Sequence, residues 1–105
     1  CFTMDALNRF LNFCMCLDLD LAWTWCRSTA ESNSIKWQPE ILTGGGTDTM
    51  GLQQFTAGGS IAGAISVPTR HIHQVIETCD KSDIKNSIDL LVSCIQEIGE
   101  YDWSY

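Results

Sequence analysis

The chain has 105 residues, of which 45% are hydrophobic and 18% are charged, so it has room for one small domain and is too apolar to be intrinsically disordered. Thirteen acidic residues against six basic ones give a formal net charge of -7. No cluster of lysine and arginine is available to neutralise phosphates, which excludes nucleic acid as an expected partner.

The cysteines and the apolar N-terminal region bear on the cellular compartment. The six cysteines are unevenly spread and contain no C-x-x-C pair, which is unlike a secreted disulfide framework and favours the cytoplasm. Cys14, Cys16 and Cys26 fit no standard zinc spacing, so we expect buried structural thiols. Asp18 and Asp20 interrupt the longest apolar region, which also lacks a basic start, so we expect neither a membrane-spanning helix nor a signal peptide.

The first third of the chain mixes two periodicities. Residues 1–26 form a Cys- and Trp-rich segment. Within it, the spacing of apolar residues predicts a helix over 4–17, and strict alternation predicts a short strand over 17–23. Asp18 and Asp20 of this strand are expected to face solvent. A short helix is expected over 27–34. It leads into an extended segment over 35–42, bent at Pro39.

The middle of the chain predicts a loop, a helix and a strand. Three consecutive glycines indicate a tight loop over 43–49. Thr47 or Asp48 is then the expected N-cap of a brief helix over 49–55. The small and β-branched run at 60–67 is typical of a strand buried on both faces.

The C-terminal part contains the clearest element. Residues 74–80 are expected to be a short strand or linker, after which Ser82 or Asp83 caps a helix that runs to about residue 99. Its apolar residues recur at steps of four and three and predict one core-facing stripe: Ile84, Ile88, Leu91, Ile95 and Ile98. The aromatic tail 100–105 should pack back on the body. Together the elements predict an α/β fold of strands with flanking helices and a long C-terminal helix.

Both histidines of the chain, His71 and His73, follow the predicted buried strand, where open α/β sheets place functional sites. On an extended segment their rings would point the same way and Ile72 the opposite way, which suits a metal site or a catalytic pair. The alternative is one hydrogen-bonded structural histidine and one solvated histidine. The glycine loop has no G-K-[ST] sequence after it, so nucleotide binding is not expected.

Three stretches carry a family resemblance: residues 37–53, 62–77 and 87–98. In order and spacing they resemble the C-terminal end of the glutamyl and deblocking aminopeptidase family, dinuclear metallopeptidases also labelled cellulase M or endoglucanase. The specific combination is a Gly-Gly-Thr-Asp loop followed some twenty residues later by Pro-Thr-Arg-x-x-His. The resemblance covers roughly residues 27–105, leaves 1–26 outside, and implies part of a zinc-peptidase-like α/β sandwich.

The resemblance also implies roles for particular residues. His73 matches a metal ligand of the family, whereas His71 occupies a position usually filled by an aromatic ring. Arg70 would anchor the turn beside the ligand through hydrogen bonds or an ion pair. The glycine loop would line the active site and shape the substrate pocket through Gly45, Gly46, Thr47 and Asp48.

The implied parent enzyme uses two divalent ions, of zinc, cobalt or manganese, to activate water against a peptide carbonyl. The family's other ligands and its catalytic glutamate come from sequence upstream of any stretch found here, so we assign no catalytic residue and expect no stably bound metal in the chain alone. The interpretation is a fragment of a cytoplasmic, homo-oligomeric aminopeptidase that acts on peptide substrates, without contact with nucleic acid or membrane, and that is inactive by itself. The alternative is a non-catalytic interaction or scaffold module that retains a remnant of the peptidase fold.

Overall fold

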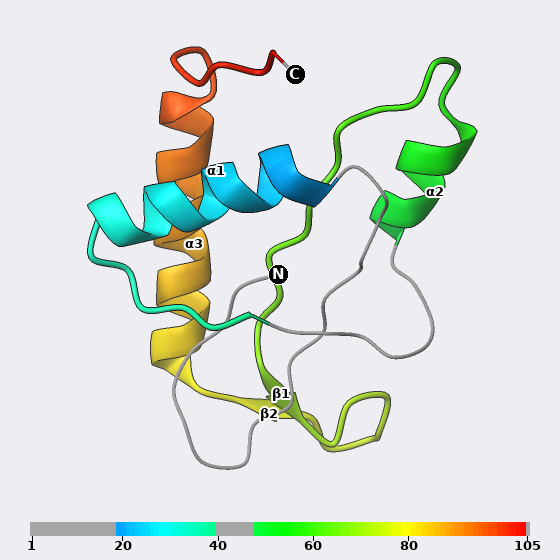
Figure 1. Ribbon diagram of the computed structural model, residues 1–105. Helices are drawn as coiled ribbons and strands as arrows, with labels where there is room; N and C mark the ends of the chain where they lie inside the picture. Colours follow the sequence, from blue (N-terminus) through cyan, green and yellow to red (C-terminus); the bar gives the residue numbers. More distant parts are fainter. Residues whose placement is uncertain (1–18, 40–47, 105) are drawn as a thin grey trace.

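The computed structural model describes residues 19–39 and 48–104. In chain order the elements are α1 (Leu19–Ser32), α2 (Asp48–Phe55), β1 (Thr69–Arg70), β2 (Thr78–Cys79) and α3 (Lys81–Glu97). Figure 1 shows α1 lying across α3, with α2 to one side and the β1–β2 hairpin at the end of the molecule opposite the C-terminus. The helix predicted over 4–17, with Cys14 and Cys16, lies outside the described residues. Within the described ranges, no helix has the length and apolar character that a membrane crossing requires.

Helix α1 replaces the strand predicted over 17–23, so that prediction is wrong for residues 19–23, whereas the helix predicted from Arg27 is confirmed as far as Ser32. The helical period prevails because it places a row of small and polar residues against α3, and in this row Ala22, Thr29 and Ala30 are buried. The side chain of Asp20, which was predicted to face solvent, is not among the side chains that the structure describes.

Helix α1 ends in a Schellman motif. Ile35 N donates to Ala30 O across 2.8 Å, and Ser34 N donates to Glu31 O across 3.2 Å. Ser34 takes the left-handed position with a φ of 55°, where glycine is the usual residue. Ile35 then packs on the buried core beside Ala30. The cap thus directs the chain out of the helix and back onto the core.

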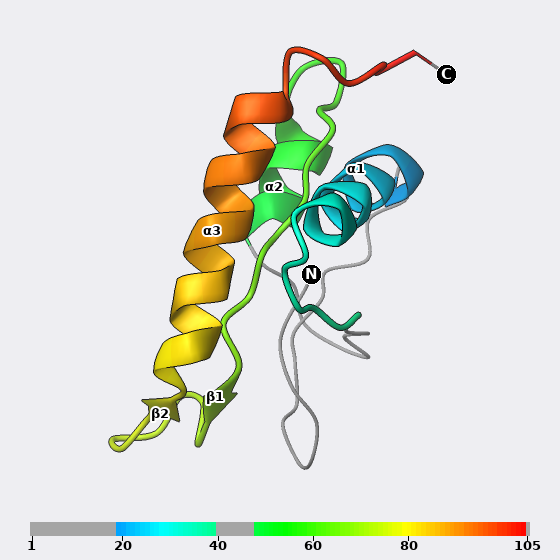
Figure 2. The same cartoon turned by 90° about the vertical axis from the view of Figure 1, so that its left-hand side faces the viewer.

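The segment after α2 differs most from expectation. The brief helix predicted over 49–55 is confirmed as α2, but residues 60–67 form no strand. A strand buried on both faces needs hydrogen-bonded neighbours, and the described part of the chain contains a ladder only between β1 and β2. Residues 60–67 instead run as irregular chain past α1 and α3 (Figure 2), with Ile65 packed against the core.

The sheet is a short antiparallel hairpin. Thr69 pairs with Cys79 and Arg70 pairs with Thr78, so the strand or linker expected over 74–80 is confirmed at residues 78–79. The described architecture is therefore a mixed one of helices and a two-stranded sheet, which is compatible with the α/β class. A sheet covered on both faces is not found among the described residues, because both strands are exposed or half-buried.

Helix α3 begins two or three residues earlier than predicted. Its N-cap is Asp80, not Ser82 or Asp83, because Asp80 is the last residue with extended backbone and its Oδ1 accepts hydrogen bonds from Ser82 N at 2.8 Å and Ser82 Oγ at 2.6 Å. The C-cap is Ile98, which agrees with the predicted end near residue 99. Asp83 belongs to the first turn and is buried.

The apolar stripe of α3 is not the buried face, so this prediction is also wrong. The five residues of the stripe are between 38% exposed at Ile84 and 60% exposed at Ile95. The helix instead buries the row that contains Asp83, Leu90 and Cys94. The physical reason is that α1 is the described helix that packs on α3, and it covers that row.

The aromatic tail packs back on the body as expected. Trp103 lies 5.0 Å from Trp25 and 4.8 Å from Tyr101 between ring centroids, in edge-to-face contacts. Its indole Nε1 donates to Ile98 O across 3.0 Å. The tail thereby joins the end of α3 to α1. Tyr105 lies outside the described residues.

Candidate functional site

The two histidines lie in the turn between β1 and β2. Gln74 N donates to His71 O across 2.9 Å, and His73 N donates to the Glu77 carboxylate across 2.6 Å. Both histidines have left-handed backbone, with φ of 57° at His71 and 61° at His73, a conformation that histidine adopts more readily than most residues. The expected extended segment, with both rings on one side, is therefore wrong because the chain turns at these residues.

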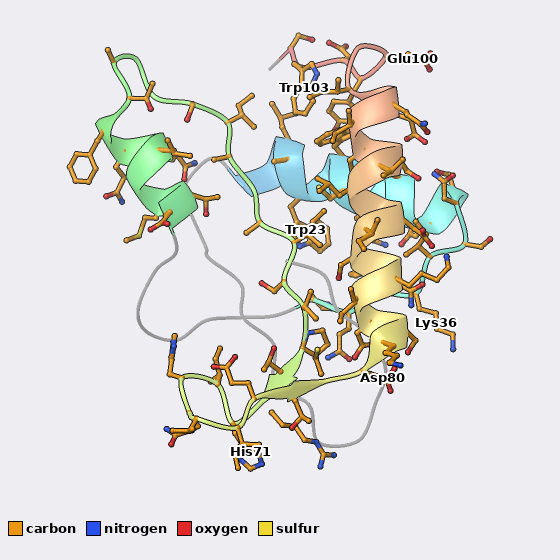
Figure 3. All side chains as sticks on the ribbon, turned by 180° about the vertical axis from the view of Figure 1, so that it is seen from behind. Trp23, Lys36, His71, Asp80, Glu100 and Trp103 are labelled. Carbon is orange, nitrogen blue, oxygen red and sulfur yellow. The ribbon has the colours of Figure 1, made fainter. Side chains whose placement is uncertain are left out.

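The turn is displayed to solvent. Every residue from Arg70 to Asp80 is exposed, and Figure 3 shows the His71 side chain at the lower edge of the hairpin, pointing away from the rest of the molecule. Three apolar side chains are exposed on the same turn: Ile72, Val75 and Ile76. A turn that combines two imidazoles with three exposed apolar side chains offers a contact surface.

The structure brings together only some of the predicted site residues. Arg70, His71 and His73 share the hairpin, and Arg70 has no side-chain partner within the described ranges. Asp48 begins α2, which Figure 1 shows at a separate part of the molecule. The loop residues Gly45, Gly46 and Thr47 lie outside the described residues. The placement of the glycine loop beside His73, which the resemblance implies, therefore stays a prediction.

The described residues do not fit a dinuclear metal centre. In residues 19–39 and 48–104, no three side chains of histidine, cysteine, aspartate or glutamate gather closely enough to hold a metal ion. His73 contributes one imidazole, and the nearest carboxylate in its turn, that of Glu77, accepts the His73 main-chain N–H. Two ions require several ligands each, so the remaining ligands would have to come from other sequence.

An apolar cleft lies between α1, the irregular segment and α3. Its volume is about 590 Å³, and the exposed stripe of α3 contributes Leu91, Ile95 and Ile98 to its wall. Trp25 and Trp103 also line it, with their ring centroids 5.0 Å apart. The cleft has the apolar character of a packing or binding surface. Of its lining residues, the sequence pattern had grouped only Leu91, Ile95 and Ile98, as part of the apolar face of the C-terminal helix.

A pair of thiols that lines this cleft was not anticipated from the sequence. Cys26 Sγ of α1 and Cys94 Sγ of α3 are 3.9 Å apart, and both residues line the cleft. The adjoining Cys26 thiol acts as a hydrogen-bond partner that lowers the pKa of Cys94, and the same interaction together with burial raises the pKa of Cys26. The one sequence signal for this position is the helical spacing of Cys26 with Ala22 and Ala30, which places all three residues on the same face of α1.

The comparisons with known proteins agree with the motif-based resemblance. Residues 20–90 match the family described as M42 glutamyl aminopeptidase, a match that covers more than half of the chain. The chain belongs to the M42 glutamyl aminopeptidase family. The match to this family begins at the second residue of α1 and includes the whole histidine hairpin.

The length of one curated relative shows how much of a whole protein the chain represents. A protein of Acetivibrio thermocellus named "Putative aminopeptidase" is 48% identical over 67 residues, which are 64% of this chain and 20% of that protein. The chain therefore spans about a fifth of the length of this relative. No solved structure matches the chain.

Proposed function

We propose that the chain is one part of a metal-dependent aminopeptidase that hydrolyses N-terminal residues from peptides, and that it has no activity in isolation. Membership of the M42 family and the 48% identity to a protein named as an aminopeptidase support the peptidase function. The inactivity is supported by the span of a fifth of that protein's length and by the ligand set, since no three ligating side chains gather in the described ranges.

The observation that carries the proposal is the exposed histidine turn. Ile72, Val75 and Ile76 are exposed beside His71 and His73, which is unfavourable in water and is offset when such side chains contact another surface. We therefore assign the turn to a contact with the remainder of a catalytic domain. There His73 would supply one imidazole to a divalent ion of zinc, cobalt or manganese, and His71 would lie beside it.

The other predicted residues have supporting roles in the proposal. Gly45, Gly46, Thr47 and Asp48 would shape the substrate pocket of the whole enzyme, and Arg70 would steady the turn that carries His73. A homo-oligomeric parent is part of the same proposal and is supported by the uncovered apolar stripe of α3. A cytoplasmic location is supported by the free thiols of Cys26, Cys79 and Cys94.

The rival function is a non-catalytic interaction module. One observation favours it: the apolar cleft of about 590 Å³ between α1 and α3 offers a binding surface that requires no metal. If the chain is part of an aminopeptidase, its matched stretch should be able to replace the corresponding stretch of an active enzyme. A non-catalytic module should not be able to do so.

A chimera tests the proposal. The 67-residue stretch of the Acetivibrio thermocellus protein would be replaced by the matching stretch of this chain, and hydrolysis of aminoacyl-p-nitroanilides would be measured with zinc, cobalt or manganese against the unmodified protein. We expect the chimera to retain hydrolysis and the isolated 105-residue chain to have none. A folded but inactive chimera would overturn the peptidase function. Turnover by the isolated chain that His73→Ala abolishes would overturn its inactivity.

A further inference from the structure

We propose that Cys26 and Cys94 form a redox pair, which small hydroperoxides oxidise to an intramolecular disulfide that locks α1 onto α3. The proposal concerns a site apart from the histidine turn and does not depend on peptidase activity. It rests first on geometry: the two sulfurs lie 3.9 Å apart, although the residues are 68 positions apart in the sequence.

The positions of both sulfurs are fixed by packing. Cys94 is 2% exposed and forms the buried core with Ala30 and Leu90, while Cys26 packs against this core from α1. A disulfide needs a sulfur–sulfur distance of about 2.05 Å. Each sulfur would therefore have to move by about 1 Å, which side-chain rotation can supply with little change in the helices.

A small oxidant can reach the pair. Cys26 and Cys94 both line the cleft of about 590 Å³, a volume many times that of a hydrogen peroxide molecule, so we expect a small oxidant to approach the sulfurs from the cleft. The other described cysteine, Cys79, is exposed in β2 and has no second thiol in contact within the described ranges. Among the described cysteines, Cys26 and Cys94 are therefore the two whose sulfurs lie close enough to form a disulfide with each other, whereas Cys79 is only exposed to solvent.

The two thiols have different roles. Because the Cys26 thiol stabilises charge on Cys94 and retains its own proton, the lowered pKa of Cys94 makes it the attacking thiolate and the raised pKa of Cys26 makes it the resolving thiol. Burial opposes this lowering of the Cys94 pKa most, and the negative charge of Glu97 opposes it further. The order of attack follows from the contact between the sulfurs.

The reaction balances with one molecule of hydrogen peroxide. The Cys94 thiolate attacks one peroxide oxygen and the O–O bond breaks, which leaves a sulfenic acid on Cys94 and hydroxide that takes up a proton to become water. Cys26 then attacks the Cys94 sulfur, gives up its proton and expels the second oxygen as water. Two thiols lose two electrons in total, and the peroxide is reduced to two water molecules.

The test uses the full 105-residue chain with Cys1, Cys14, Cys16 and Cys79 replaced by serine. After one equivalent of hydrogen peroxide, both remaining thiols should disappear and the mass should fall by two hydrogen atoms. Tryptic peptides 10–27 and 86–105 should be linked until dithiothreitol separates them. The reaction should be at least about tenfold faster in native buffer than in concentrated guanidinium chloride, because folding holds the sulfurs together. Equal rates, or a product that gains two oxygen atoms on one cysteine, would overturn the proposal.

Single-cysteine controls test the assigned roles. With Cys26→Ser added, Cys94 should stop at a sulfenic acid that dimedone traps, whereas with Cys94→Ser added, Cys26 should react at least about tenfold more slowly. Equal trapping in the two variants would overturn the assignment of the attacking thiol. In the unsubstituted chain, peptide mapping after mild oxidation should find the Cys26–Cys94 link in excess over all other pairings, and a random distribution would overturn the pair.

Discussion

The hydroxyl of Thr29 on α1 donates a hydrogen bond of 2.9 Å to the carboxylate of Glu97 on α3. The other oxygen of that carboxylate accepts a hydrogen bond of 3.0 Å from Asn33 Nδ2. Thr29 is 1% exposed, so its hydroxyl has exchanged water for a charged acceptor. This polar contact lies beside the apolar cluster of Ala30, Leu90 and Cys94, and together they set the position of α1 on α3.

Replacing Thr29 with valine should destabilise the chain by about 1–3 kcal/mol, because the shape is kept while the hydrogen bond to a charged acceptor is lost. Urea unfolding followed by tryptophan fluorescence measures the change in the free energy of unfolding. The matched control is Ser28→Ala on the exposed side of the same helix, where the hydroxyl bonds only to Trp25 O and a change within about 0.5 kcal/mol is expected. A loss at Ser28 equal to that at Thr29 would contradict the role of the α1–α3 contact.

The exposed stripe of α3 should make the isolated chain associate, bind the hydrophobic dye ANS and unfold over a broad temperature range. Ile88→Lys together with Ile95→Lys should reduce dye binding and association without loss of helicity, since both side chains are more than half exposed. Leu90→Ala, on the buried face of the same helix, should instead cost about 2–5 kcal/mol.

Measurements on the unsubstituted chain can also contradict this prediction about the exposed stripe of α3. A monomer at high concentration with no dye binding and a sharp thermal transition would show that the stripe needs no cover. That result would favour the self-standing module over the aminopeptidase part.

His73, and not His71, should carry the metal affinity of the chimeric enzyme. We expect His73→Ala to remove one metal ion per subunit and nearly all hydrolysis, while His71→Phe retains both, because His71 takes the place of an aromatic ring in the family pattern. Metal content by atomic emission and turnover of an aminoacyl-p-nitroanilide are the two readouts.

The left-handed backbone at His73 calls for a matched variant. Alanine is disfavoured at a φ of 61°, whereas asparagine tolerates it. His73→Asn should therefore preserve the turn but lack the imidazole, and should be as inactive as His73→Ala. Equal loss of metal from the His71 and His73 variants would refute the assignment.

The sequence by itself determined those features that depend on neighbouring residues. The period of three and four residues established α3 as a helix over nearly its full length, because backbone hydrogen bonding within a helix is local. The acidic and hydroxyl residues around Asp48 likewise located α2. Arg70, His71 and His73 had to lie close together because they are nearly consecutive, and the Pro-Thr-Arg-x-x-His motif was sufficient to recognise the family.

Only the tertiary structure decided which surfaces are buried. An amphipathic pattern states that a face must be covered but not by which partner, and α1 covers the row of Leu90 and Cys94 in place of the isoleucine stripe. The same contact made residues 19–23 helical against their alternation, since a strand gains stability only from a paired neighbour. The approach of Cys26 to Cys94 across 68 positions could not be predicted, because it depends on how two helices cross and not on any local pattern.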